Sequence, residues 1–113
     1  MQKIGILMIC GLLLCACGKK EINNSLQELL NEKEYVLIDV RTKEEFMEGH
    51  LKEAINIPYD TINEDIELDK DKNIFVYCKS GRRSEIAYKT LKDLGFDVYD
   101  LGAFDEIDLP KTK

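Results

Sequence analysis

The sequence has little positive charge and no repetition. Sixteen lysine and arginine residues stand against 22 aspartate and glutamate residues, a formal net charge of −6. Such an acidic chain is poorly suited to binding nucleic acid or anionic lipid surfaces. There are no internal repeats or low-complexity tracts. The 113 residues, 44% hydrophobic and 34% charged, are typical of one small soluble domain rather than a disordered or fibrous chain.

A long hydrophobic run is also missing. Residues 4–14 are apolar, but a membrane-spanning helix needs about 20 apolar residues. The run ends in Leu14-Cys15-Ala16-Cys17, which resembles the lipobox of bacterial lipoproteins and has a small residue before the last cysteine. The alternatives are a plain secretory signal and a buried apolar helix. The charged residues that directly follow the run disfavour both.

This pattern predicts an exported lipoprotein. Residues 1–16 would be a cleaved signal peptide, and Cys17 would carry the lipid. Residues 17–21 would form a tether to the membrane. We therefore expect a location in the bacterial cell envelope, on the extracytoplasmic side, with membrane contact supplied by the lipid.

Cysteine is scarce outside this leader. Of the four cysteines, Cys10 and Cys15 would leave with the signal and Cys17 would be acylated, so Cys78 would be the only thiol of the folded part. No disulfide could then form within the domain. Because a free thiol in an oxidising compartment is oxidised or captured unless it has a use, we expect Cys78 to be functional.

The hydrophobic pattern predicts alternating helices and strands. Because the connections are long enough for crossovers, the pattern indicates an α/β domain with a mainly parallel sheet. Ligands bind at the carboxyl ends of such strands. Cys78 and Asp39-Val40-Arg41 both follow predicted strands and would share one site. The predicted strands are 35–38, 54–57, 73–77 and 98–101. One helix is predicted to begin after Ser25. A second begins after Thr42 and ends at Gly49, and a third begins after the loop at Cys78 and ends at Gly95.

The segment Cys78-Lys79-Ser80-Gly81-Arg82-Arg83-Ser84 carries the chemistry. It places a thiol where backbone N–H groups, the N-terminus of a helix and three cations converge, and each of these lowers the pKa of a thiol. The alternative is that Cys78 acts as a small hydrophobic residue. A loop of lysine, serine, glycine and arginine has little apolar purpose, so the pattern favours a reactive thiolate that also attracts an anion.

The length of the loop distinguishes two kinds of chemistry. Tyrosine and low-molecular-weight phosphatases, and similar arsenate reductases, place five residues between cysteine and arginine. Here four residues separate Cys78 from Arg83, and Ser84 occupies the position that a phosphatase needs. A loop that is one residue shorter suits a smaller group bound to the cysteine sulfur than the oxyanion that a phosphatase binds. A relay-type arsenate reductase would also need resolving cysteines, which the predicted domain lacks.

Several short motifs together resemble a single-domain rhodanese. They occur in the order of that family across residues 22–109, nearly all of the chain after the predicted signal. One departure is Gly102-Ala103-Phe104, where the family often has two glycines and then a tryptophan, a residue that this chain lacks. The matching motifs are Asp39-Val40-Arg41, Glu45-Phe46, Gly49-His50-Leu51, residues 54–58, the loop from Cys78 to Ser84, Gly95-Phe96-Asp97-Val98 and Leu101-Gly102.

The resemblance implies a fold of five mainly parallel strands with helices on both faces. Residues 22–109 would form this domain, and Ile22 could begin a short edge strand. Residues 110–113 would be a C-terminal tail, with the last helix short or missing. No cofactor and no metal are implied, and a monomer is expected.

The resemblance also implies a two-step transfer of sulfur. The Cys78 thiolate would attack the outer sulfur of thiosulfate or another sulfane donor and hold it as a persulfide. It would then pass the sulfur to cyanide or to a thiol acceptor. A carrier that stores the persulfide for a partner without turnover is the alternative.

Roles for the remaining residues follow from the same resemblance. Asp39, Arg41 and Ser84 would support the loop, with Arg41 paired to Asp39 or to Glu45. His50 is the one histidine, and we expect it to be structural rather than a general base. The residues expected to bind the anionic donor, through backbone N–H groups or positive charge, are Lys79, Ser80, Gly81, Arg82 and Arg83.

Overall fold

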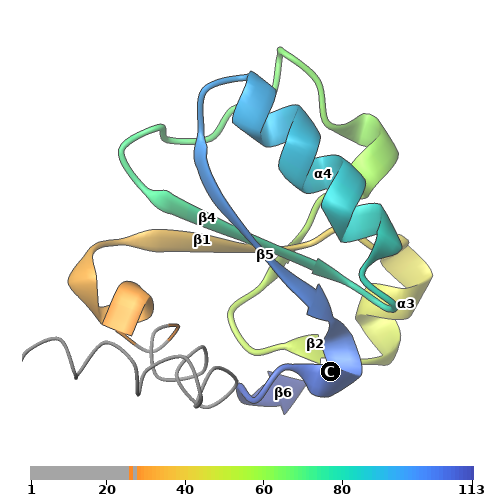
Figure 1. Ribbon diagram of the computed structural model, residues 1–113. Coiled ribbons are helices and arrows are strands. Elements are labelled where there is room, and N and C mark those ends of the chain that lie inside the picture. Colours follow the sequence, from red (N-terminus) through yellow and green to blue (C-terminus); the bar gives the residue numbers. More distant parts are fainter. Residues whose placement is uncertain (1–25, 27) are drawn as a thin grey trace, which may run out of the picture. The chain divides into compact units, whose positions relative to one another are not determined.

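The centre of the fold is a parallel sheet of four strands (Figure 1). In spatial order these are β3 (Ile55–Asn56), β1 (Tyr35–Asp39), β4 (Asn73–Cys78) and β5 (Asp97–Ala103), and all neighbouring pairs are parallel. The computed structural model describes residues 26 and 28–113. All six residues of β4 are buried, as an uninterrupted apolar run predicts for a central strand covered on both faces.

The predicted α/β class and mainly parallel sheet are confirmed, with one difference in the number of strands. Within the described residues the central sheet has four strands where five were expected. The possible edge strand at Ile22 lies outside the described residues, as do the predicted signal peptide and the lipidated Cys17.

The C-terminus differs from the expected tail. Lys111–Thr112 form β6, which pairs antiparallel with β2 (His50–Leu51) in a separate two-stranded sheet. The backbone N–H of Lys52 also donates to the carbonyl of Pro110 at 2.8 Å. Residues 110–113 are therefore tied to the fold by main-chain hydrogen bonds, which no hydrophobic pattern in these residues could reveal.

The two faces of the sheet are covered differently. One face packs against α4 (Arg82–Asp93), where Val76 of the sheet meets Ala87 and Leu91 of the helix in the apolar core. Because side chains alternate along a strand, Tyr77 points to the opposite face, where its ring stacks on Phe104. Phe104 begins the short 3-10 helix η2 (Phe104–Glu106). Helices thus lie on both faces, as expected.

Two helices begin at the carboxyl end of the sheet, and both start as the sequence predicts. α3 (Lys43–Glu48) begins with a capping box, in which Thr42 and Glu45 satisfy each other's backbone N–H groups, and it ends at Gly49. α4 begins directly after Gly81 and is followed by Gly95, whose φ of 96° is left-handed. A further 3-10 helix, η1 (Tyr59–Thr61), follows β3.

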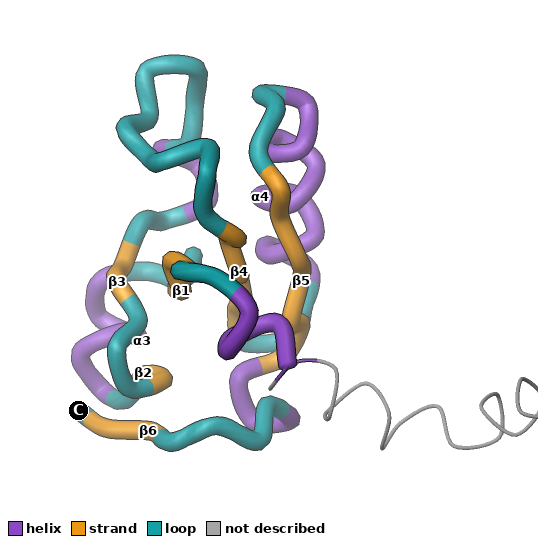
Figure 2. Tube along the Cα trace, turned by 90° about the vertical axis from the view of Figure 1, so that its left-hand side faces the viewer, coloured by secondary structure: helices purple, strands orange, loops and turns teal. Residues whose placement is uncertain are grey.

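The carboxyl ends of β1 and β4 lie next to each other. Asp39 is in register with Tyr77 in the parallel pairing, and the backbone N–H of Val40 donates to the carbonyl of Tyr77 at 3.0 Å. The tube in Figure 2 shows β1 and β4 as neighbours at the middle of the sheet. Asp39-Val40-Arg41 and Cys78 are therefore brought together, as expected.

The chain divides into two compact units, Met1–Glu32 and Lys33–Lys113. In the first unit, residues 28–32 are helical, in agreement with the helix predicted after Ser25. The second unit contains the sheet and the loop at Cys78. Among the described residues, no helix has the length and apolar character that crossing a membrane requires.

Candidate active site

Cys78 is the last residue of β4 and is fully buried. The chain then turns sharply through Gly81, whose φ of 97° is in the left-handed region that favours glycine. This turn aims the backbone N–H of Gly81 at the Cys78 sulfur, with 2.9 Å between N and Sγ. The loop therefore folds back around the thiol before α4 begins, as the cradle predicted from Lys79 to Arg83 requires.

The environment of Cys78 favours its thiolate. Burial raises the pKa of the thiol, but hydrogen bonds from the Ser84 backbone N–H and hydroxyl, and from the backbone N–H groups of Gly81 and Ser80, lower it further than burial raises it. The pKa of Cys78 consequently lies below its ordinary value. Ser84 is fully buried beside the thiol, and its hydroxyl also lies 3.2 Å from the carbonyl oxygen of Gly81.

The three cations of the loop differ in how they are engaged. Arg83 forms a two-pronged ion pair with Glu45, with N–O distances of 2.8 and 3.1 Å. The side chains of Lys79 and Arg82 are exposed and form no ion pair within the described part of the chain. Of the three cations expected to attract the donor, Arg83 is therefore already held by a carboxylate.

Asp39 and Arg41 form a buried ion pair. Arg41 donates from Nε and Nη2 to the carboxylate of Asp39 at 2.7 to 3.1 Å, and Nη2 also donates to the carbonyl of Gly49 at 2.6 Å. The Asp39 carboxylate also accepts the hydroxyl of Tyr77 at 2.9 Å. Of the two partners predicted for Arg41, the structure shows Asp39, while Glu45 turns to Arg83.

His50 has the surroundings of a structural residue. Its ring stacks on Phe46 with a centroid separation of 3.7 Å, and Nδ1 lies 2.8 Å from the carbonyl oxygen of Phe46. This contact holds the turn between α3 and β2. The predicted structural role of His50 agrees with this geometry.

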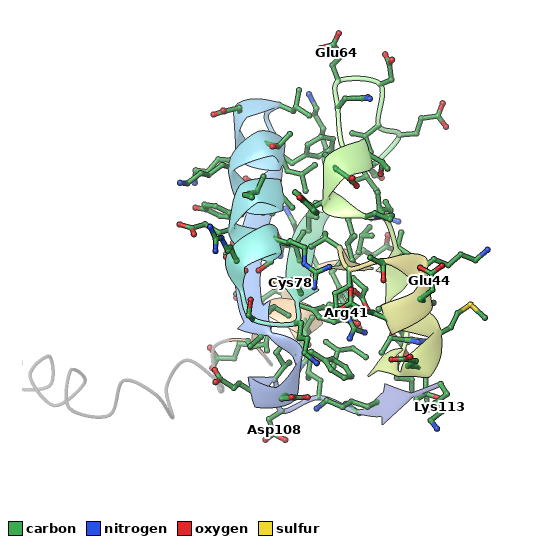
Figure 3. All side chains as sticks on the ribbon, turned by 90° about the vertical axis from the view of Figure 1, so that its right-hand side faces the viewer. Arg41, Glu44, Glu64, Cys78, Asp108 and Lys113 are labelled. Carbon is green, nitrogen blue, oxygen red and sulfur yellow. The ribbon has the colours of Figure 1, made fainter. Side chains whose placement is uncertain are left out.

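A cleft of about 200 Å³ opens beside the cysteine loop. Figure 3 shows the labelled side chains of Cys78 and Arg41 close together on this side of the molecule. The cleft contains charges of both signs next to one aromatic ring. Its lining residues are Arg41, Glu45, Glu48, Gly49, Lys79, Phe104 and Asp105. Within the described residues, no group of three histidine, cysteine, aspartate or glutamate residues could hold a metal ion.

Two positioning residues were missed from the sequence. The hydrophobic pattern predicts Tyr77 only as part of an apolar strand, yet its hydroxyl donates to Asp39 and accepts the backbone N–H of Leu51 at 2.9 Å. Glu45 was treated as a possible partner of Arg41 rather than of Arg83. The signal that could have revealed the polar role of Tyr77 is its hydroxyl group, which an otherwise apolar strand carries directly before the cysteine. The partner of Glu45 lies 38 residues away and had no local signal.

A comparison with known domain families identifies the family of this chain. The model of the rhodanese-like domain matches residues 23–107. The chain belongs to the rhodanese-like domain family.

Known rhodanese-like proteins show substantial similarity to this chain. A putative sulfurtransferase of Bacillus subtilis is 42% identical over 85 residues, covering 73% of this chain and 82% of that protein. A thiosulfate sulfurtransferase of Escherichia coli is 38% identical over 80 residues, covering 67% and 77% respectively. The solved structure of a rhodanese with anions from E. coli superposes with a TM-score of 0.62 and 34% identity, covering 70% of this chain and 98% of that one.

Other relatives are much longer than this chain. The chain spans only 23% of the adenylyltransferase and sulfurtransferase of Ogataea parapolymorpha, to which it is 32% identical over 90 residues. It spans 38% of a putative sulfur carrier protein of B. subtilis. The rhodanese-like domain therefore occurs among the relatives both as most of a protein and as a part of larger ones.

The first prediction concerns the Cys78 thiolate. Replacing Ser84 by alanine removes the hydroxyl hydrogen bond, so we expect the pKa of Cys78 to rise. The thiolate absorbance in the ultraviolet measures this, after subtraction of the matching Cys78→Ser spectrum. Ser80→Ala is the matched control, because only the backbone N–H of Ser80 acts on the thiol. An unchanged pKa in Ser84→Ala contradicts this assignment.

The second prediction concerns the ion pair of Glu45. Its hydrogen bond from Arg83, with a smaller contribution from Thr42, outweighs burial and lowers the pKa of Glu45 to about 2. Because the pKa of Glu45 is lower in the folded state, its ionised carboxylate stabilises the fold at pH values above the ordinary pKa near 4.3. This contribution is lost as the pH falls toward 2. Glu45→Gln should therefore lower the free energy of unfolding by about 1–2 kcal/mol at neutral pH and by about half as much near pH 3.

Unfolding by urea at the two pH values measures this difference. The neighbouring Glu44 is exposed and forms no ion pair with any described residue, so Glu44→Gln is the matched control and should change stability far less. A destabilisation by Glu45→Gln that is equal at both pH values would show that the charge of the carboxylate is not its source.

Proposed function

We propose that this protein is a sulfurtransferase that moves a sulfane sulfur from thiosulfate or a similar donor to cyanide or a thiol. Support comes from one observation above all: the Cys78 sulfur is held 2.9 Å from the Gly81 N–H in a loop that lowers its pKa. Relatives named thiosulfate sulfurtransferase and putative sulfurtransferase support the same reaction.

In the first step, the Cys78 thiolate attacks the outer sulfur of the donor. A new S–S bond forms to Cys78, and the bond between the outer sulfur and the sulfite sulfur breaks, with its electron pair leaving on sulfite. The backbone N–H groups of the loop stabilise negative charge on the transferred sulfur. The exposed cations Lys79 and Arg82 attract the anionic donor and screen the departing sulfite.

In the second step, the acceptor attacks the outer sulfur of the persulfide. The S–S bond to Cys78 breaks, and its electron pair restores the Cys78 thiolate, so no oxidant or reductant is consumed. The complete burial of Cys78 favours donors that present one terminal sulfur atom over bulky disulfides. The added sulfur lengthens the side chain by one atom, which brings the reactive atom closer to the acceptor.

A second candidate is a persulfide carrier that delivers sulfur to a partner protein without turnover of its own. The similarity to a putative sulfur carrier protein of B. subtilis favours it, at 34% identity over 71 residues. The first step is the same in both functions. They differ in whether a small acceptor discharges the persulfide.

The third prediction tests this function with the full chain. Incubation with thiosulfate should add the mass of one sulfur atom at Cys78, and cyanide should then yield thiocyanate. Cys78→Ser should abolish both, while Cys15→Ser, a cysteine of the predicted leader, should preserve them. A persulfide at Cys78 with no thiocyanate indicates the carrier. Thiocyanate formation by Cys78→Ser would refute the proposed nucleophile.

We also propose that the protein is exported and lipid-anchored through Cys17. The apolar residues 4–14 and the motif Leu14-Cys15-Ala16-Cys17 support this. The acidic domain has little attraction of its own for anionic lipid, so the anchor would supply the membrane contact.

The fourth prediction tests the anchor in a bacterium that processes lipoproteins. The chain should incorporate labelled palmitate, appear in the membrane fraction and lose residues 1–16. Cys17→Ser should lose the label and retain the leader, whereas Cys15→Ser should behave as the unchanged chain. A label that persists in Cys17→Ser would contradict the assignment.

A further inference from the structure

The cleft beside the cysteine loop has two carboxylates that the proposed sulfur transfer does not use. Arg41 is paired with Asp39, and Glu45 with Arg83. The remaining charged side chains of the lining are Lys79, Glu48 and Asp105, all exposed, and none forms an ion pair with another described residue. The cleft therefore offers one free ammonium group and two free carboxylates to a ligand.

These charges come from three separate elements. Lys79 directly follows the nucleophile Cys78, Glu48 ends α3, and Asp105 lies in η2. The ring of Phe104 also lines the cleft and is itself fixed by stacking on Tyr77 and by the Arg41 guanidinium 4.4 Å from its centroid. The positive charge therefore comes from the residue next to Cys78 in the sequence, and the negative charges come from two other elements that line the cleft.

We propose that this cleft is the subsite of the sulfur acceptor and that it selects small thiols carrying an ammonium group. The acceptor's thiolate would be drawn toward Lys79 and the persulfide, and its ammonium group would lie between Glu48 and Asp105. Its short carbon chain would contact the Phe104 ring. A volume of about 200 Å³ is enough for such a small molecule. This inference rests on the sulfur transfer proposed above.

The chemical step is the discharge already described, with an amino thiol as acceptor. Its thiolate forms a bond to the outer sulfur, the S–S bond to Cys78 breaks, and the electron pair returns to Cys78. The product is the persulfide of the amino thiol. The ammonium group is not consumed, and it acts only by binding.

The experiment compares three acceptors of similar size and different charge: cysteamine, 2-mercaptoethanol and 3-mercaptopropionate. The full chain is first converted to the Cys78 persulfide with thiosulfate, and the rate of its loss with each thiol is followed by intact mass. Each variant's rate is divided by the rate of the unchanged chain with the same thiol. This ratio cancels the intrinsic reactivity of the thiol.

The double variant Glu48→Gln with Asp105→Asn should slow discharge by cysteamine about threefold to tenfold. It should leave the rate of discharge by 2-mercaptoethanol unchanged and increase the rate of discharge by 3-mercaptopropionate by a similar factor. The loss with cysteamine should shrink as salt is added. Glu48→Lys, which places a cation at the end of a helix where it is tolerated, should shift the preference further toward 3-mercaptopropionate.

The matched control removes two acidic charges elsewhere, through Glu64→Gln with Asp65→Asn. Both residues are exposed, and Figure 3 shows Glu64 at the end of the molecule away from Cys78 and Arg41. If this control changes the three rates as much as the cleft variant does, the effect comes from net charge and the subsite is refuted.

The two proposals fail in different ways. If thiosulfate adds no sulfur to Cys78, the sulfur transfer fails and the subsite with it. If the persulfide forms and cyanide discharges it, but the cleft variant alters the three thiols equally, only the subsite is overturned.

Discussion

The carboxylate of Asp39 is the group on which the geometry of the site depends. It is fully buried at the carboxyl end of β1, and a buried charge is tolerated only when it is paired and its oxygens are hydrogen-bonded. Arg41 and Tyr77 meet this demand together. Removing either partner would leave a charge or a polar group buried without compensation. The carboxylate therefore fixes the relative position of β1 and β4, and with it the residue that follows Tyr77, the proposed nucleophile Cys78.

The same network extends to three other segments of the chain. Arg41 also donates to the Gly49 carbonyl, and Tyr77 accepts the backbone N–H of Leu51, so α3 and β2 are held against the sheet. The Arg41 guanidinium lies over the Phe104 ring, which attaches η2. The Glu45 carboxylate then connects the start of α3 to Arg83 at the start of α4. Two acidic residues thus hold two arginines, and the positive charge left for an anionic donor comes from Lys79 and Arg82.

Much of this arrangement could be predicted from the sequence because its signals are local. The apolar run from Ile74 to Tyr77, the turn at Gly81 and the capping box at Thr42 each depend on neighbouring residues, and all three agree with the structure. Other features depend on residues that the fold brings together. The choice of Arg83 by Glu45, the polar role of Tyr77 and the pairing of β6 with β2 have no periodicity or motif. They follow from contacts across the sheet and could not be deduced from spacing.

Phe104 shows how a departure from the family pattern is accommodated. Phe104 stands where the family often has a tryptophan, and its ring stacks on Tyr77, faces Arg41 and lies 5.3 Å from Nζ of Lys111. These contacts are made by the face of the ring and do not need an indole N–H. Phenylalanine is therefore sufficient for this stacking, and its ring is smaller than that of a tryptophan. The substitution keeps the C-terminus attached and leaves space beside the cysteine loop, where the sulfur acceptor would have to enter.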